Sequence, residues 1–142
     1  MPAGAGPLGF VYFAAIKAVG YTAASGVLKR GFGLSALPTP PLWKVGLTRT
    51  GIGIVVGAAY GSIWIFGLNK LLPDTYPFFF YVFLLPVRLA EWKLLIWIFF
   101  DRGLQDRARL KKYVAIGTVW SYALDAIAVG AAVVLPGGLW VC

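Results

Sequence analysis

Residues 76–100 have the sequence YPFFFYVFLLPVRLAEWKLLIWIFF. A helix that crosses a bilayer needs about 20 mainly apolar residues, and this stretch is long enough. It also contains the charged residues Arg88, Glu91 and Lys93. The stretch therefore predicts a membrane-spanning helix with charges that need partners inside the protein.

The composition of the whole chain agrees with this prediction. Of its 142 residues, 60% are hydrophobic and 13% are charged, and the mean hydropathy is +0.80. Soluble domains carry about 25% charged and about 45–50% apolar residues. A soluble core of this size has no room for so much apolar surface, whereas lipid solvates apolar side chains directly. Residues 1–142 are therefore predicted to form a single membrane domain.

Three further stretches are long and apolar enough to span a bilayer, namely residues 8–28, 51–72 and 113–135. The connector after the first contains the helix-breaking run Pro38-Thr39-Pro40-Pro41. The polar residues 101–112 are expected to form a helix near the surface, around Gly103. The predicted fold is an all-α integral membrane protein, a bundle of four transmembrane helices.

The basic residues between the spans predict the orientation. The first connector carries Lys29, Arg30, Lys44 and Arg49, the third carries Arg102, Arg107, Arg109, Lys111 and Lys112, and the second carries Lys70. Cytoplasmic loops of membrane proteins are rich in Lys and Arg. We therefore expect the first and third connectors to be cytoplasmic and both termini to be non-cytoplasmic. This bias is typical of a bacterial inner (cytoplasmic) membrane.

Four charged residues within the spans are predicted to form a cluster: Lys17, Arg88, Glu91 and Asp125. At about 1.5 Å per residue, Lys17, Asp125 and Arg88 lie roughly 14, 15 and 18 Å from the outer ends of their spans. A charge at the bilayer centre costs about 2.5–3.5 kcal/mol on insertion scales. We therefore expect a buried, charge-balanced cluster, with Lys17 paired to Asp125 and with Arg88 and Glu91 on one helix face.

A polar stripe on the fourth span supports the cluster. Thr118, Ser121, Tyr122 and Asp125 are spaced i, i+3, i+4, i+7, so they share one helix face. Lys93 points away from Glu91 and is expected to reach the cytoplasmic side or another subunit. Two interpretations of the cluster remain open. It either locks the helices together, or it lines a path or binding site for protons, ions or a polar headgroup.

Span two contains Gly53, Gly57 and Gly61 at intervals of four. Small residues at this spacing let helix backbones approach closely. The pattern predicts helix packing within the bundle, and a seam between copies of the chain is the alternative.

Several function classes are excluded by the residues that the chain lacks. It contains no histidine and a single cysteine, Cys142, so histidine-based dyads and cysteine-based zinc spacing are absent. Nucleotide-binding glycine patterns and the Gly-x-Ser-x-Gly motif are also absent. We therefore expect no enzymatic activity, catalytic residue, metal or cofactor. No basic block is interleaved with aromatics, which argues against nucleic acid as a partner.

The expected function is that of a non-catalytic integral membrane subunit of a larger membrane complex. It would contact the lipid bilayer and bind other integral membrane subunits through aromatic and small-residue helix faces. The alternative is a small homo-oligomeric transporter or channel that uses the charged cluster, with self-association instead of foreign partners.

Overall fold

The computed structural model describes residues 7–33, 41–67 and 76–132. This part of the chain is all-α, with four helices and no strand, so the predicted four-helix fold class is confirmed to that extent. The helices are α1 (Pro7–Gly31), α2 (Leu42–Phe66), α3 (Tyr76–Phe99) and α4 (Arg107–Ala132).

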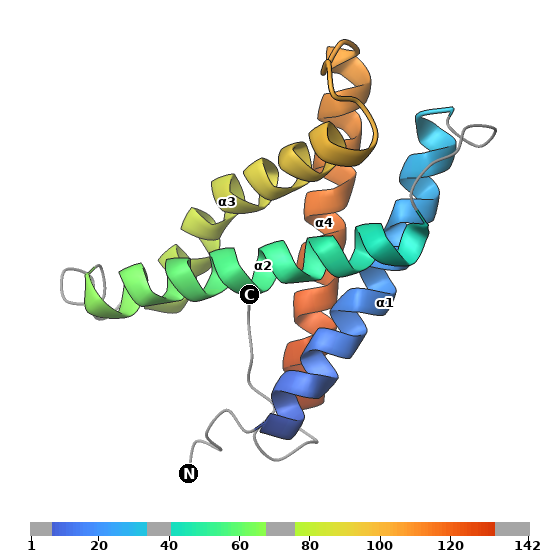
Figure 1. The fold of residues 1–142 in the computed structure, drawn as a ribbon. Coiled ribbons are helices and arrows are strands. Elements are labelled where there is room, and N and C mark those ends of the chain that lie inside the picture. The colour runs from blue at the N-terminus through green and yellow to red at the C-terminus, as the bar shows by residue number, and fades with distance from the viewer. Residues whose placement is uncertain (1–6, 34–40, 68–75, 133–142) are drawn as a thin grey trace.

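The helices form two antiparallel pairs that cross each other (Figure 1). The first pair is α1 and α4, which lie side by side and run in opposite directions. The second pair is α2 and α3, which run across the first pair. The most extensive helix–helix contact joins α1 to α2. The centres of all four helices therefore meet in one region, and this crossing positions the candidate site.

The starts of two helices differ from the prediction. Helix α2 begins at Leu42 rather than Gly51, directly after the last proline of the breaker run. The N–H of Lys44 already donates to the carbonyl of Pro41 at 2.9 Å. Proline lacks an N–H, but a residue at the start of a helix does not need one for the helical hydrogen bonds. Pro41 can therefore directly precede α2.

The expected helix around Gly103 is wrong. Residues 101–106 form a turn in which Leu104 has a φ of 48°. Helix α4 then begins at Arg107, because the Asp106 carboxylate caps it by accepting the Arg109 N–H at 2.9 Å. Aspartate is among the preferred N-cap residues, so the sequence carried a signal for this start.

Small residues allow close packing at the crossing of α1 and α2. A Cβ added to Gly46 would lie 2.8–2.9 Å from the backbone N and Cα of Thr22, so only glycine fits there. On α4, Gly117 leaves room for the indole ring of Trp92, which is buried in the apolar core. The core thus depends on glycines at helix crossings.

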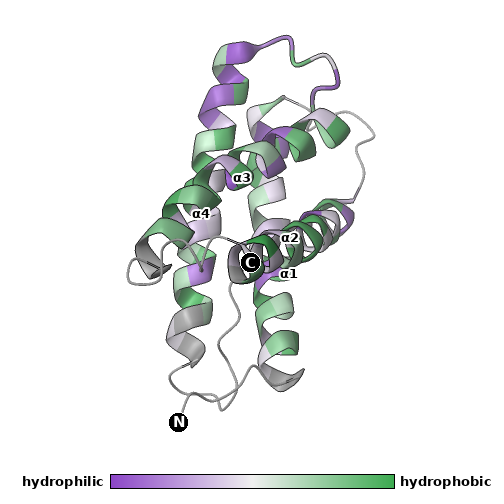
Figure 2. Cartoon of the chain, turned by 90° about the vertical axis from the view of Figure 1, so that its left-hand side faces the viewer, coloured by the Kyte–Doolittle hydropathy of each residue, from purple (hydrophilic) through white to green (hydrophobic). Residues whose placement is uncertain are grey.

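The helices consist largely of hydrophobic residues (Figure 2). Twenty large hydrophobic side chains of the described residues are exposed, with Val19, Val55 and Val119 exposed by 70% or more. Hydrophilic residues gather at one end, around the 101–106 turn and the start of α4. By length and composition, the described chain contains one helix that could cross a membrane, α1 over Gly9–Gly31.

Candidate functional site

Five charged side chains, drawn from all four helices, meet where the helix pairs cross. In order of contact they are Lys17 (α1), Asp125 (α4), Arg88 (α3), Glu91 (α3) and Arg49 (α2). Each is at most 4% exposed. The signs alternate along the chain of ion pairs, so each carboxylate lies between two cations. This charged network is the candidate site.

Asp125 joins α4 to two other helices. Its Oδ1 accepts from the ammonium group of Lys17, and its Oδ2 lies 2.9 Å from Nη2 of Arg88. The two carboxylate oxygens therefore bind two different cations. Ion-pair hydrogen bonds are stronger in a buried site than in water, because the local dielectric is low.

Glu91 joins the remaining helices through one oxygen. Its Oε2 lies 3.3 Å from Nη1 of Arg88 on the same helix and 2.7 Å from Nη2 of Arg49 on α2. Arg88 and Glu91 are three residues apart, so helix geometry places them on one face. Without Glu91, Arg49 would be a buried cation without its ion-pair partner.

Arg49 is a member of the network that the sequence does not predict. Its place in the predicted first connector makes it one of the basic residues that indicate the cytoplasmic side. Because α2 begins at Leu42, Arg49 instead lies within the helix, and it is fully buried. The apolar spacing of Leu42, Val45 and Gly46 is helical and places Arg49 on the same face. That spacing was the available signal.

Aromatic rings enclose the guanidinium group of Arg49. Its Cζ lies 4.7 Å from the ring centroid of Tyr21 and 5.2 Å from that of Trp92. These two rings meet edge to face at 5.8 Å. Arginine binds favourably over aromatic faces, and more strongly when desolvated. The two rings thus stabilise a charge that has a single carboxylate partner among the described residues.

The polar stripe of α4 divides into residues with different roles. Ser121 is fully buried, and its Oγ accepts from Trp92 Nε1 at 2.9 Å and from the Tyr21 hydroxyl at 3.3 Å. Thr118 is buried, and its Oγ1 has no hydrogen-bond partner among the described residues. Tyr122 donates to the carbonyl of Tyr81 on α3 at 3.0 Å. Ser121 and Asp125 therefore belong to the network, and Tyr122 ties α4 to α3.

The glycines of the predicted pattern on α2 have different surroundings. A Cβ on Gly61 would meet nothing within 4 Å, and a Cβ on Gly53 would meet Nη1 of Arg49 at 3.2 Å. Gly57 is half-buried. The close approach to α1 is instead made at Gly46. Lys93 is exposed, on the opposite side of α3 from Glu91.

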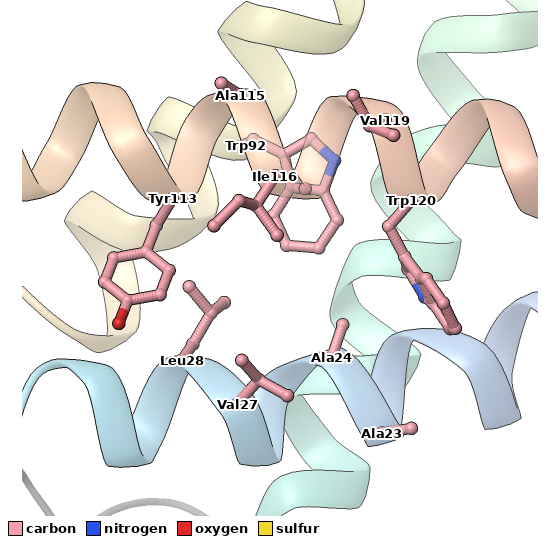
Figure 3. Close-up of a pocket in the computed structure, with 11 residues that line it drawn as sticks. Ala23, Ala24, Val27, Leu28, Trp92, Tyr113, Ala115, Ile116, Val119 and Trp120 are labelled. Atoms are coloured by element: carbon pink, nitrogen blue, oxygen red, sulfur yellow. The ribbon is translucent and has the colours of Figure 1, made fainter.

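An apolar groove of about 470 Å³ lies between α1 and α4, beside the network (Figure 3). Ala23, Ala24 and Val27 on α1 face Ile116 and Trp120 on α4 across it. The groove is lined almost entirely by apolar atoms. Its small side chains leave space for an apolar group from outside the chain.

The arrangement of the charged network suits a structural role better than a role in proton transfer. Both carboxylates of the network bind two cations each, so neither is placed to act as a free general base. An alternating chain of ion pairs links four helices and fixes their relative positions, which is the best-attested use of buried polar groups.

No protein-family model, no curated protein and no solved structure matches the chain.

Proposed function

We propose that the protein is a non-catalytic integral membrane subunit of a larger membrane complex. The observation that carries the proposal is an inverted distribution of side chains. In the part of the chain that the structure describes, five charged residues are buried at the centre, while twenty large hydrophobic side chains are exposed. Soluble monomers rarely expose large apolar patches, and they bury charges rarely. In a bilayer the same distribution is favourable, because lipid covers the apolar faces and the charges find partners inside.

Helix lengths are compatible with four spans despite the crossing of the pairs. The helices have 24 to 26 residues, so each is about 36–39 Å long. A helix of that length crosses about 30 Å of hydrocarbon even when tilted by about 35°, within the range seen in membrane proteins. Opposite tilts of the two pairs would allow all four helices to span.

The proposed orientation rests on the basic residues at one end. Arg49 lies in the network and no longer counts as a marker, but Lys29, Arg30 and Lys44 remain in or beside the first connector, and the group around Arg107 flanks the start of α4. These residues support cytoplasmic first and third connectors and non-cytoplasmic termini. A bacterial inner membrane remains part of the proposal.

The groove between α1 and α4 is the proposed binding site for a helix of a partner subunit. Alanines on its walls allow a second helix backbone to approach closely, as small residues do at membrane interfaces. The pairing of both carboxylates favours this structural role over the alternative, a homo-oligomeric transporter or channel.

Co-purification from the native membrane in mild detergent tests the proposal. We expect other membrane subunits at fixed stoichiometry with the wild-type chain. Ala23→Trp should fill the groove and reduce their recovery at least several-fold, whereas Ala59→Trp, at an exposed alanine on α2, should leave it unchanged. Isolation of the chain alone, or as a homo-oligomer, would reject the subunit function, and flux in proteoliposomes abolished by Asp125→Asn would support transport instead.

A further inference from the structure

An exposed face of α3 carries a cation near the end of the helix. At spacings of i, i+3, i+4 and i+7, this face presents Ala90, Lys93, Leu94 and Trp97, all of them exposed. Lys93 lies six residues before Phe99, the last residue of α3, or about 9 Å along the helix axis. In the proposed bilayer, the ammonium group of Lys93 must therefore extend toward the headgroups to avoid the hydrocarbon region.

Three hollows, each of about 300–320 Å³, extend from this face to the end of α3. The first is lined almost entirely by apolar atoms, from Ala90, Lys93, Leu94, Trp97 and Leu104. The second shares Trp97 with the first and includes Arg102. The third shares Arg102 with the second and has a mixed polar and apolar lining. The surface thus changes from apolar to polar in the direction from Ala90 to Arg102.

The turn after α3 forms one wall of the first hollow. Leu104 in this turn has a φ of 48°, which is rare for a bulky residue. It lines the hollow together with Lys93 and Trp97 of the helix. Strained backbone persists where the surrounding structure holds it, and it is frequent at ligand-binding sites. Two separate segments therefore build the hollow, which is more than a gap between neighbouring side chains of one helix.

The two cations of this surface are available to a ligand. Lys93 and Arg102 have no carboxylate partner among the described residues. Of the carboxylates in the turn, Asp106 pairs with Arg109 and Asp101 accepts the N–H of Gly103 at 3.2 Å. A complementary occupant therefore has an apolar tail for the first hollow and an anionic group for the cations.

We propose that this surface binds an anionic phospholipid of the cytoplasmic leaflet. Lys93 and Arg102 bind its phosphate, and an acyl chain lies in the first hollow. A helix of a partner subunit fits this surface less well, because Leu94 and Trp97 are bulky, and helix backbones approach closely over small residues. The inference rests on the membrane location in the proposed function, but it does not require partner subunits.

Tryptophan fluorescence of the purified full chain in lipid vesicles tests the site. The vesicles contain equal fractions of phosphatidylglycerol and phosphatidylcholine, and the acyl chains of one or the other are brominated, because bromine quenches nearby tryptophans. The Trp97 signal is the difference between the wild type and Trp97→Phe. A basic residue near the membrane surface favours an anionic lipid by about fivefold, so we expect at least this preference for phosphatidylglycerol at Trp97. Equal quenching by the two lipids would overturn the proposal.

Charge variants locate the effect. Lys93→Met and Arg102→Gln should each lower the preference for phosphatidylglycerol about threefold. Arg107→Gln is the matched control, because Arg107 is exposed at the same end of the molecule but lines none of the three hollows. At physiological salt it should lower the preference less than about 1.5-fold. Equal effects of the three variants would show a general attraction of anionic lipid to this end, and would reject the site.

Ala90→Phe tests the hollow without changing a charge. The larger side chain should fill the first hollow and lower the preference for phosphatidylglycerol about twofold or more. An unchanged preference would show that the cations act without an acyl-chain site, and would reject that part of the proposal.

The outcomes separate this inference from the proposed function. Equal quenching of Trp97 by the two lipids, in a chain that still co-purifies with partner subunits, would reject the lipid site alone. If neither brominated lipid quenched any tryptophan of the chain, the membrane location would be rejected, and both proposals with it.

Discussion

Glu91 holds two guanidinium groups with a single carboxylate oxygen, at 2.7 Å from Arg49 and 3.3 Å from Arg88. Glu91 therefore forms the ion pair that joins α3 to α2. The sequence places Arg88 and Glu91 on one face from their spacing alone. It could not place Arg49 beside them while the start of α2 was assigned to Gly51.

Neutralising Glu91 should therefore be costly. Glu91→Gln removes the negative charge that faces both guanidinium groups, and breaking a buried ion pair from one side typically costs about 3–5 kcal/mol. We expect a loss of about 3 kcal/mol in the free energy of unfolding, measured by denaturant titration in mixed micelles.

Asp106→Asn is the matched control for Glu91→Gln. Asp106 pairs with Arg109 at 3.2 Å, but both side chains are more than 40% exposed. Exposed pairs contribute about 0–1 kcal/mol, and asparagine keeps the N-cap. Similar losses for the two variants would contradict a buried, energetically coupled network.

The pair between Lys17 and Asp125 can be tested by a double-mutant cycle. Asp125→Asn leaves both Lys17 and Arg88 without their shared carboxylate, so it should destabilise the protein strongly. Adding Lys17→Met removes one of the two cations that lose this carboxylate. The unfolding free energy of the double variant should therefore fall by about 1–2 kcal/mol less than the sum of the losses in the single variants. Full recovery is not expected, because Arg88 remains. Strict additivity of unfolding free energies would show that Lys17 and Asp125 do not interact.

At the scale of the helices, the sequence predicted the existence of all four and the boundaries of α1 and α3 closely. The length of an apolar run predicts that a helix exists there, and the bounds of α1 and α3 coincide with such runs. The predicted starts of α2 and α4 lie too late in the sequence, because Lys44, Arg49 and the basic residues from Arg107 onward are typical of a connector. Tertiary partners and a cap, rather than hydrophobicity, extend these helices. The crossing of the helix pairs could not be predicted from the sequence either, because hydropathy carries no information on the angles between helices.

The crossing of α1 and α2 gives a prediction about Gly46. Gly46→Ala should force the backbones of the two helices apart, because the new Cβ would lie within 3 Å of Thr22 backbone atoms. Overpacking of this kind costs about 1–3 kcal/mol. Thermal unfolding of the variant in detergent measures this loss.

Gly51→Ala provides the comparison on the same helix. A Cβ at Gly51 meets nothing within 4 Å, and alanine favours a helix interior over glycine by about 0.5–1 kcal/mol. This variant should therefore be as stable as the wild type or slightly more so. If Gly46→Ala behaves like Gly51→Ala, the close approach at Thr22 is not a constraint on the fold.

At the scale of the whole molecule, the proposed orientation can be tested with the single native cysteine, Cys142. If the C-terminus is non-cytoplasmic, a membrane-impermeant maleimide should label Cys142 in intact spheroplasts. Gly103→Cys in a Cys142→Ser background should be labelled only after permeabilisation, because Gly103 lies at the end rich in basic residues. The reverse pattern would invert the topology, and equal labelling of both sites without permeabilisation would argue against a membrane-embedded chain.

The alternating order of charges along the network has a consequence for biogenesis. Lys17 lies on the first helix, but its carboxylate partner lies 108 residues later, on the last. At a synthesis rate of about 5–20 residues per second, Lys17 waits roughly 5–20 s before Asp125 emerges. In the proposed bilayer, early helices would therefore stay beside the insertion machinery with their charges shielded, and a chain truncated before α4 would be a substrate for membrane quality-control proteases.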